Sequence, residues 1–202
     1  MNSASAELLV WPFPMPGRLL TLAYRELDLA AEGTEEQKGA LGPASELPRP
    51  WDPGTCSNQK LRRELWAWLE DVVTWLNHEY VFEPADAIPT CWPQHPHLVH
   101  EVAVLADQRR KAMYTFTSDA MEEWHRYSLP QFIERLKRRV EDHCNDGHPT
   151  SWPASGRFNR HTQDPAAANR QRRYVEDLKT AAARATPHAC EIVDPDTGEI
   201  IN

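Results

Sequence analysis

One uninterrupted helical stretch, residues 58 to 80, constrains the fold of this chain more than any other feature. It begins at Asn58, a good N-terminal cap, and neither Pro nor Gly interrupts it before Tyr80. Its apolar residues recur at spacings of three and four and form one continuous face, made of Leu61, Leu65, Trp68, Leu69, Val72, Trp75 and Leu76. Such a face must be buried, and we interpret its Trp residues as core and rim packing.

Two further helices are expected to form an antiparallel hairpin. The first covers residues 96 to 116 and begins with Pro96, and the second begins at Asp119, which forms a capping box with Glu122. Each helix has about 20 to 25 residues and therefore spans roughly 30 to 37 Å. Because almost nothing separates them, the start of the first should lie beside the end of the second. Pro130 should kink the second helix.

The 17 Pro residues divide the rest of the chain. Residues 1 to 57 are expected to form a flexible, irregular, Pro-rich N-terminal arm with one short helix at 18 to 31 and a linker. Residues 58 to 148 are expected to form the helical core domain. Residues 149 to 202 hold a linker, a basic helix and a short terminal β-hairpin. We therefore predict a mainly α fold with a three-helix core, which should fold without residues 1 to 57.

A Cys with a His four residues later occurs at each end of the predicted hairpin. Cys91 and His95 enter its first helix, and Cys144 and His148 leave its second. The antiparallel arrangement would bring these four side chains together at one end of the hairpin. Two Cys and two His form the ligand set of a closed structural zinc site, so we predict one zinc ion as a structural cofactor.

Other interpretations of this pattern remain open. The two Cys could be inert packing residues or form a disulfide, and a different helix phase could exchange the ligands for His97, His100, His125 or His143. A zinc-dependent hydrolase would need an open coordination position and a general base, for which Glu101 and Glu141 lie near enough in sequence. The chain contains no Walker loop, no Rossmann glycine pattern and no HExxH motif, and we expect no enzyme.

One basic segment offers an alternative function. The net charge is −8, which argues against nucleic-acid binding by the whole molecule. Within residues 157 to 184, however, Lys and Arg outnumber Asp and Glu, and the candidate phosphate contacts are Arg157, Arg160, Arg170, Arg172, Arg173 and Lys179. Basic side chains on a helix beside Tyr174 could follow a nucleic-acid backbone. The alternative function is therefore that of a nucleic-acid-associated accessory protein.

Location and partners are predicted from what the sequence lacks. It contains no apolar run long enough to span a membrane, and its first residues lack the basic start of a signal peptide, so we expect a cytoplasmic protein that binds no membrane. Thiols stay reduced there, which favours metal ligands over disulfides for the four Cys. A protein partner is expected to dock on the arm, through Trp11, Phe13 and residues 19 to 27, or on the terminal hairpin.

The central part of the chain contains a Trp-rich helix from Trp66 to Trp75, then Cys91, Trp92 and His95, and then Trp124 and His125 in a later helix. In these features it resembles an uncharacterised domain family of actinobacteria, their phages and plasmids. This resemblance covers roughly residues 58 to 148, and the family has no established activity. The resemblance implies an accessory protein of a mobile genetic element. Our expectation is therefore a non-enzymatic binding or adaptor protein with a structural zinc site.

Overall fold

The computed structural model describes residues 10–81, 83–140, 166–184, 192–193 and 200–201. These residues are mainly helical, and none of the helices is both long and apolar enough to cross a membrane. The helices are α1 (Arg18–Glu32), α2 (Glu35–Ala40), α3 (Gln59–Glu79), α4 (Pro96–Met113), α5 (Asp119–Glu123), α6 (Leu129–Val140) and α8 (Ala166–Arg184). Short turns of 3-10 helix are η1 (Pro53–Thr55), η2 (Pro84–Asp86) and η3 (Trp92–Gln94), and η4 (Trp124–Ser128) is one π-helical turn.

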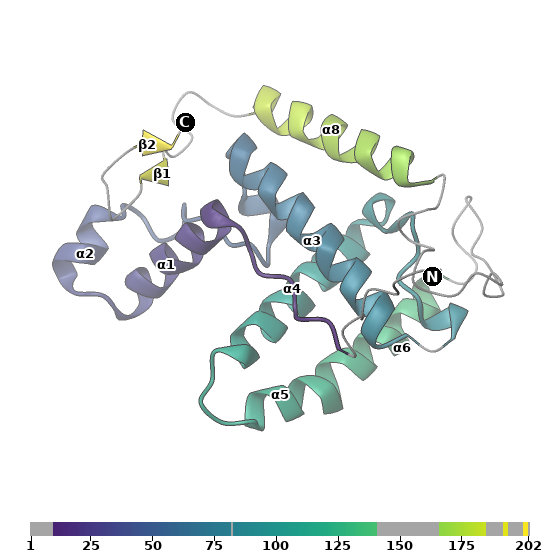
Figure 1. Ribbon diagram of the computed structural model, residues 1–202. Helices are drawn as coiled ribbons and strands as arrows, with labels where there is room; N and C mark the ends of the chain where they lie inside the picture. The colour runs from purple at the N-terminus through teal and green to yellow at the C-terminus, as the bar shows by residue number, and fades with distance from the viewer. Residues whose placement is uncertain (1–9, 82, 141–165, 185–191, 194–199, 202) are drawn as a thin grey trace, which may run out of the picture.

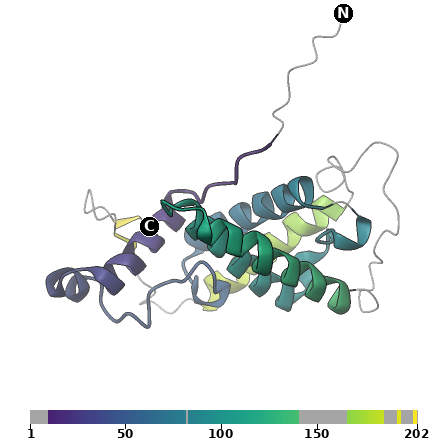
Figure 2. The ribbon, with the colours of Figure 1, turned by 90° about the horizontal axis from the view of Figure 1, so that it is seen from below.

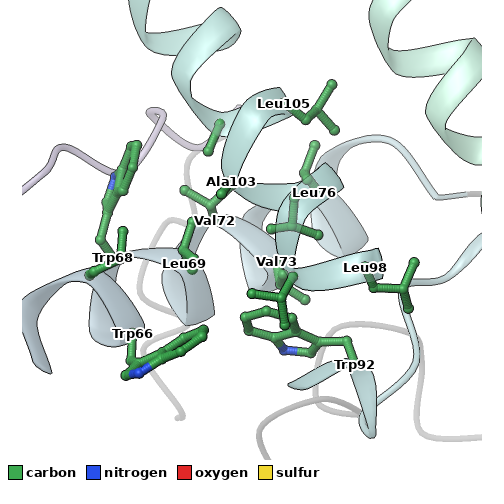
Figure 3. Close-up of a cluster of buried hydrophobic side chains, with 14 of the residues drawn as sticks. Trp66, Trp68, Leu69, Val72, Val73, Leu76, Trp92, Leu98, Ala103 and Leu105 are labelled. Atoms are coloured by element: carbon green, nitrogen blue, oxygen red, sulfur yellow. The ribbon is translucent and has the colours of Figure 1, made fainter. Parts of the chain in front are cut away.

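Helix α3 lies at the centre, between α8 on one side and the α4–α6 hairpin on the other (Figures 1 and 2). Asn58 caps it as predicted, since its side-chain oxygen accepts the N–H groups of Lys60 and Leu61 at 2.9 and 3.0 Å. All seven residues of the predicted apolar face are buried. Figure 3 shows this face meeting side chains of α4, with Trp92 beside Trp66. The helix therefore organises the core in the way its sequence predicts.

The predicted antiparallel hairpin is confirmed. Glu101 near the start of α4 pairs with Arg135 at 2.7 Å and also with Arg139, and both arginines lie near the end of α6. Pro130 does not produce a sharp break. It follows the π-helical turn η4, and the wider turn accommodates a residue that lacks an N–H and whose ring crowds the preceding turn.

The N-terminal segment from Val10 onward lies against α3, which corrects the expectation of a flexible arm for these residues. It runs along the helix in the opposite direction, because Trp75 donates its indole N–H to the carbonyl of Trp11 at 3.0 Å and Trp68 donates to that of Pro14 at 2.9 Å. Phe13 packs edge to face on the Trp75 ring and is 7% exposed. Residues 1–9 lie outside the described part of the chain.

Helix α1 confirms the predicted short helix and is also fixed to α3. Its N-cap, Gly17, has no side chain, and Glu64 of α3 instead accepts the N–H of Leu20 at 2.9 Å. A Cβ at Gly17 would lie only 2.5 Å from Cδ of Glu64, so a larger residue here would displace the carboxylate that accepts the N–H of Leu20. Leu20, Leu22 and Ala23 join the same hydrophobic core as α3.

The predicted linker, residues 32 to 57, is more ordered than its composition suggests. Helix α2 begins with a complete capping box between Thr34 and Gln37. Further along, Leu47 and Cys56 are buried, and Cys56 belongs to the core. Burial raises the pKa of the Cys56 thiol to about 11, so this thiol is a packing residue rather than a reactive one.

The C-terminal region contains α8, which confirms the predicted fourth helix, and two very short strands. Strand β1 (Ile192–Val193) pairs antiparallel with β2 (Ile200–Ile201), with Ile192 opposite Ile201. Residues 194–199, which would form the turn of the predicted β-hairpin, lie outside the described residues. On the face of α8 that meets α3, Tyr174 and Leu178 are buried in the hydrophobic core.

Candidate functional site

Cys91 and His95 lie together at the entrance to α4. Cys91 precedes η3 and His95 is the N-cap of α4, so the short connector with Pro93 places one side chain over the other. The Cys91 sulfur lies 3.3 Å from Nε2 of His95. Two ligands on one tetrahedral zinc, with usual Zn–S and Zn–N bond lengths, would be about 3.5 Å apart. The pair therefore fits half of a zinc site.

The other half of the predicted ligand set lies just beyond the described end of α6. Cys144 and His148 are outside the described residues, as are His143 and Glu141. Within the part of the chain that is described, no three His, Cys, Asp or Glu residues gather in a metal-binding arrangement. The Glu101 pairs nevertheless place the end of α6 beside the start of α4, as the zinc prediction requires.

The three described substitute ligands fall in different places. His97 lies two residues after His95, with 5.8 Å between the ring centroids, and its Nε2 is buried without a hydrogen-bond partner among the described residues. His100 is exposed on α4. His125 lies in η4 and contacts the Tyr80 hydroxyl, with Nε2 3.1 Å from the oxygen. Of these three, His97 is the one beside His95, but Cys91, His95 and His97 do not form a three-ligand group among the described residues.

Arg170 of the predicted basic segment is buried instead of facing nucleic acid. Only 4% of Arg170 is exposed, and its Nε donates to Oε1 of Glu70 at 3.0 Å. The Tyr174 hydroxyl and, at 3.3 Å, the Trp92 indole N–H donate to Oε2 of the same carboxylate. Burial and this carboxylate raise the pKa of Tyr174 well above its usual value. We call Glu70, Trp92, Arg170 and Tyr174 the Glu70 cluster.

A second ionic contact fixes the middle of α8 to α3. Asp177 accepts N–H groups from Arg62 at 2.6 and 2.9 Å and from the Trp66 indole at 2.6 Å. Partial burial alone would raise the pKa of Asp177, but the hydrogen bonds and charge of Arg62 and the bond from Trp66 outweigh it and hold the pKa below its usual value. Arg170 and Asp177 of α8 therefore attach this helix to α3.

The remaining basic candidates are exposed or undescribed. Arg172, Arg173 and Lys179 point to solvent, and Arg173 lies 3.8 Å from a carboxylate oxygen of Glu176. Arg157 and Arg160 lie outside the described residues. The described helix therefore offers three of the six predicted phosphate contacts, on a face where acidic residues also occur.

Arg109 occupies a site that our sequence analysis missed. Its guanidinium carbon lies 5.2, 5.5 and 5.7 Å from the ring centroids of Phe13, Trp75 and Trp124. These rings come from the N-terminal segment, from α3 and from η4, so no local sequence pattern could have joined them. The Nε and Nη1 atoms are buried and have no hydrogen-bond partner among the described residues. We call Arg109 and these three rings the Arg109 cage.

Tyr80 and His125 lie beside the Arg109 cage. The Tyr80 ring packs edge to face on Trp75 and Trp124, at centroid distances of 5.1 and 5.5 Å. Burial raises the pKa of Tyr80, although the charge of Arg109 and its hydrogen bonding to the hydroxyl act in the opposite direction. The contact between the Tyr80 hydroxyl and His125 is exposed, so it marks where the cage reaches solvent.

The turn between α4 and α5 presents large apolar side chains to solvent. Met113 is 39% exposed, Tyr114 57% and Phe116 107%. Thr115 fixes the turn by donating its hydroxyl to the carbonyl of Ala112 at 2.8 Å, and that hydroxyl also lies 2.9 Å from the carbonyl of Thr117. We call residues 113 to 117 the hairpin tip. Its apolar residues are held outward on a defined turn.

Comparison with known proteins gives no relative for this chain, since it matches no protein-family model, no curated protein and no solved structure. The resemblance through Cys91, Trp92 and His95 therefore stays a prediction. Functional conclusions depend on the sites themselves.

Proposed function

We propose that this protein is a non-enzymatic binding module that meets a partner protein with the hairpin tip. The observation that carries the proposal is the full exposure of Phe116, close in the chain to the exposed ring of Tyr114 and the exposed side chain of Met113. Single exposed apolar residues are common, but a cluster of large ones on an ordered turn is typical of an interaction site. Because Thr115 already fixes the turn, binding would cost little ordering entropy.

The hairpin tip replaces the N-terminal arm as the docking element. Phe13, Leu20 and Leu22, which the sequence offered for docking, are buried in the core of the chain itself. Trp11 is 39% exposed, but its ring stacks on His78 at a centroid distance of 3.8 Å. The partner we propose is a protein with an apolar groove that accepts the ring of Phe116.

A structural zinc site at the open end of the hairpin is part of the same proposal. The 3.3 Å contact between Cys91 and His95 supports it, as does the placement of the end of α6 beside Glu101. Cys91 and His95 would hold the ion together with Cys144 and His148. Bound zinc would join the two ends of the hairpin and so keep the tip, at its other end, in one orientation.

The biological setting of this proposal is a mobile genetic element, as the family resemblance implies. The alternative, a nucleic-acid-associated protein, is weakened because Arg170 is occupied by Glu70. A mobility-shift assay at low salt with short duplex and single-stranded DNA tests it. Retardation that disappears when Arg172, Arg173 and Lys179 are all replaced by Gln would favour the alternative over a protein-binding module.

Site-specific photo-crosslinking tests the hairpin tip directly. A photoreactive phenylalanine analogue is placed at Phe116 and, as matched controls, at Val104 and Val175, which are 41% and 47% exposed on α4 and α8. We expect one discrete crosslinked protein from position 116 in the source cells, which Tyr114→Ser weakens. Equal crosslinking from all three positions, or none from 116, would contradict the proposal.

Metal analysis tests the zinc site separately. We expect about one zinc per chain in protein purified without chelators or nickel, and a lower melting temperature after chelation. Cys91→Ser and Cys144→Ser should each lose the metal, whereas Cys56→Ser should keep it, because the buried Cys56 thiol contacts the carbonyl of Arg49 at 3.7 Å. Zinc retained by both of the first two variants would overturn the ligand assignment.

A further inference from the structure

Helix α8 is attached to the rest of the chain along a single row of side chains. Among its described side chains only Arg170, Tyr174 and Leu178 are buried, and they recur every four residues. A helix that belongs to a core normally buries a broader stripe of its surface. The main contacts of α8 are with α3 and η3, and it lies along α3 on the side opposite the α4–α6 hairpin (Figures 1 and 2). Helix α8 therefore lies on the core rather than within it.

The opposing side chains of α3 are Arg62, Trp66 and Glu70, which also recur every four residues, and we call them the α3 row. An acid, an aromatic ring and a base of α8 face them in the opposite chain order, namely Asp177, Tyr174 and Arg170. The Trp66 and Tyr174 rings are stacked, with 5.8 Å between their centroids and 13° between their planes. The two ion pairs at the ends fix the antiparallel direction, because a reversed helix would place like charges together. The α3 row thus specifies both the sequence and the direction of the helix that it binds.

The two charged residues of the α3 row also have hydrogen-bond partners outside α8. Arg62 donates from Nη1 to the carbonyls of Pro53 at 2.6 Å and of Cys56 at 3.2 Å. The Trp92 indole N–H donates to Glu70 at 3.3 Å. Removing one member of a buried ion pair is unfavourable because it leaves the other charge without a partner. Departure of α8 avoids this penalty on α3, since the core continues to hold both charged groups in position.

We propose that the α3 row and Trp92 form an exchangeable helix-binding surface, which α8 covers until an amphipathic helix of a partner protein replaces it. The partner helix carries a basic, an aromatic and an acidic residue at the spacing of Arg170, Tyr174 and Asp177, because these side chains match the α3 row. Binding of an amphipathic helix by one face is a common mode of peptide recognition. Helix α8 competes as an intramolecular ligand, with an effective concentration on the order of millimolar, and so acts as an autoinhibitory segment. This proposal is independent of the hairpin tip.

A labelled synthetic peptide of residues 166 to 184 is the probe, and its binding to the full-length protein is measured by fluorescence anisotropy. We expect weak binding to the parent protein, because α8 already covers the surface. Replacement of Tyr174 and Leu178 by Ser in the chain removes the docking of its own α8 without altering α3. The unaltered peptide should therefore bind this double variant about tenfold more tightly or better. Val175→Ser is the matched control, since Val175 is 47% exposed on the same helix, and it should bind the peptide as the parent does.

The same assay tests whether the peptide binds to the α3 row. Addition of Glu70→Gln to the double variant should remove most of the gain in affinity, because Glu70 is the partner of Arg170 in the peptide. Circular dichroism establishes that each variant is folded. A folded double variant without the gain, or a gain that Glu70→Gln leaves unchanged, would refute the proposal.

Hydrogen exchange in the parent protein tests the release of α8 without any substitution. We expect the amides of α8 to exchange as one group and sooner than those of α3. Equal protection of the two helices would overturn the exchange of α8. A dimer of the parent protein that dissociates when the peptide is added would assign the surface to α8 of a second copy and would overturn the assignment to a partner protein.

Discussion

An arginine packs against each side of α3, and the two arginines differ in the groups that surround them. On one side Arg170 is buried in the Glu70 cluster, where a carboxylate, a phenol and an indole complete its surroundings. On the other side Arg109 has aromatic rings around it, and no carboxylate among the described residues pairs with it. The first arrangement pairs the guanidinium with a carboxylate of α3, and the second surrounds the guanidinium with aromatic rings. The comparison separates an arginine that joins two helices by an ion pair from one held by cation–π contacts.

The segments that cover α3 also differ in how they are held. Residues 10 to 24 are fixed by apolar burial and by indole N–H bonds to backbone carbonyls. Helix α8 also buries Tyr174 and Leu178, but it adds ion pairs with Arg62 and Glu70. Apolar burial depends little on pH, whereas ion pairs are lost when a carboxylate is protonated. The N-terminal side should therefore be the more permanent one, and the α8 side the one that solution conditions can release.

Deletion of residues 1 to 57 should have the largest effect. It removes Phe13, Leu20, Leu22 and Tyr24 from the core, each worth roughly 1.5 to 3 kcal/mol, against a total stability of about 5 to 15 kcal/mol. We expect residues 58 to 202 to lose cooperative thermal unfolding, contrary to the independent core that the sequence suggests. Deletion of residues 1 to 9 is the control. A sharp transition in the longer deletion would restore the boundary at residue 57.

Glu70→Gln should have the next largest effect. The substitution keeps the side-chain volume but removes the carboxylate charge that pairs with the buried Arg170, at a cost of about 3 to 5 kcal/mol in unfolding free energy measured with urea. Replacing both partners, as Glu70→Leu with Arg170→Met, should recover most of this loss. If the single and double variants were equally unstable, the Glu70 cluster would owe its stability to something other than charge pairing.

The sequence predicts the fold best where its signal is local. The face of α3 from Leu61 to Leu76 follows from periodicity, and the start of α3 follows from Asn58. The hairpin follows from two helices of similar length with a short connection. The packing of Phe13 could not be predicted in this way. It depends on Trp68 and Trp75, more than fifty residues later, donating N–H groups to a backbone that composition alone classes as irregular.

The candidate sites also differ in whether local sequence spacing predicts them. Cys91 and His95 are four residues apart, so their contact could be predicted from spacing alone. The Arg109 cage joins side chains from α3, α4, η4 and the N-terminal segment, and no spacing rule connects them. For Arg170 the local pattern gave a wrong prediction. A basic residue on a helix suggested an exposed phosphate contact, but Arg170 is buried and pairs with Glu70, which lies 100 residues earlier in the chain.

Acid should weaken the α8 side through Asp177. The pKa of Asp177 is below its usual value in the folded chain, so its contribution is present above the unfolded pKa, near 3.9, and is lost as the pH falls through the folded pKa. We expect Asp177→Asn to cost about 1 to 2 kcal/mol at pH 7. Urea unfolding at a series of pH values checks this. A difference between parent and variant that stays constant below about pH 3 would contradict it.

Arg109→Gln should have the smallest effect on the stability of the protein, and it tests the comparison most directly. Three cation–π contacts, each worth roughly 0.5 to 2 kcal/mol, are lost. Relief of two buried donor atoms without partners returns roughly 1 to 3 kcal/mol for each. The two effects nearly cancel, so we expect a change of less than about 1 kcal/mol in urea unfolding. Arg170→Gln instead removes the guanidinium that pairs with the Glu70 carboxylate, and it should lower the unfolding free energy by about 3 kcal/mol or more. Equal losses in the two variants would mean that Arg109 is as structural as Arg170.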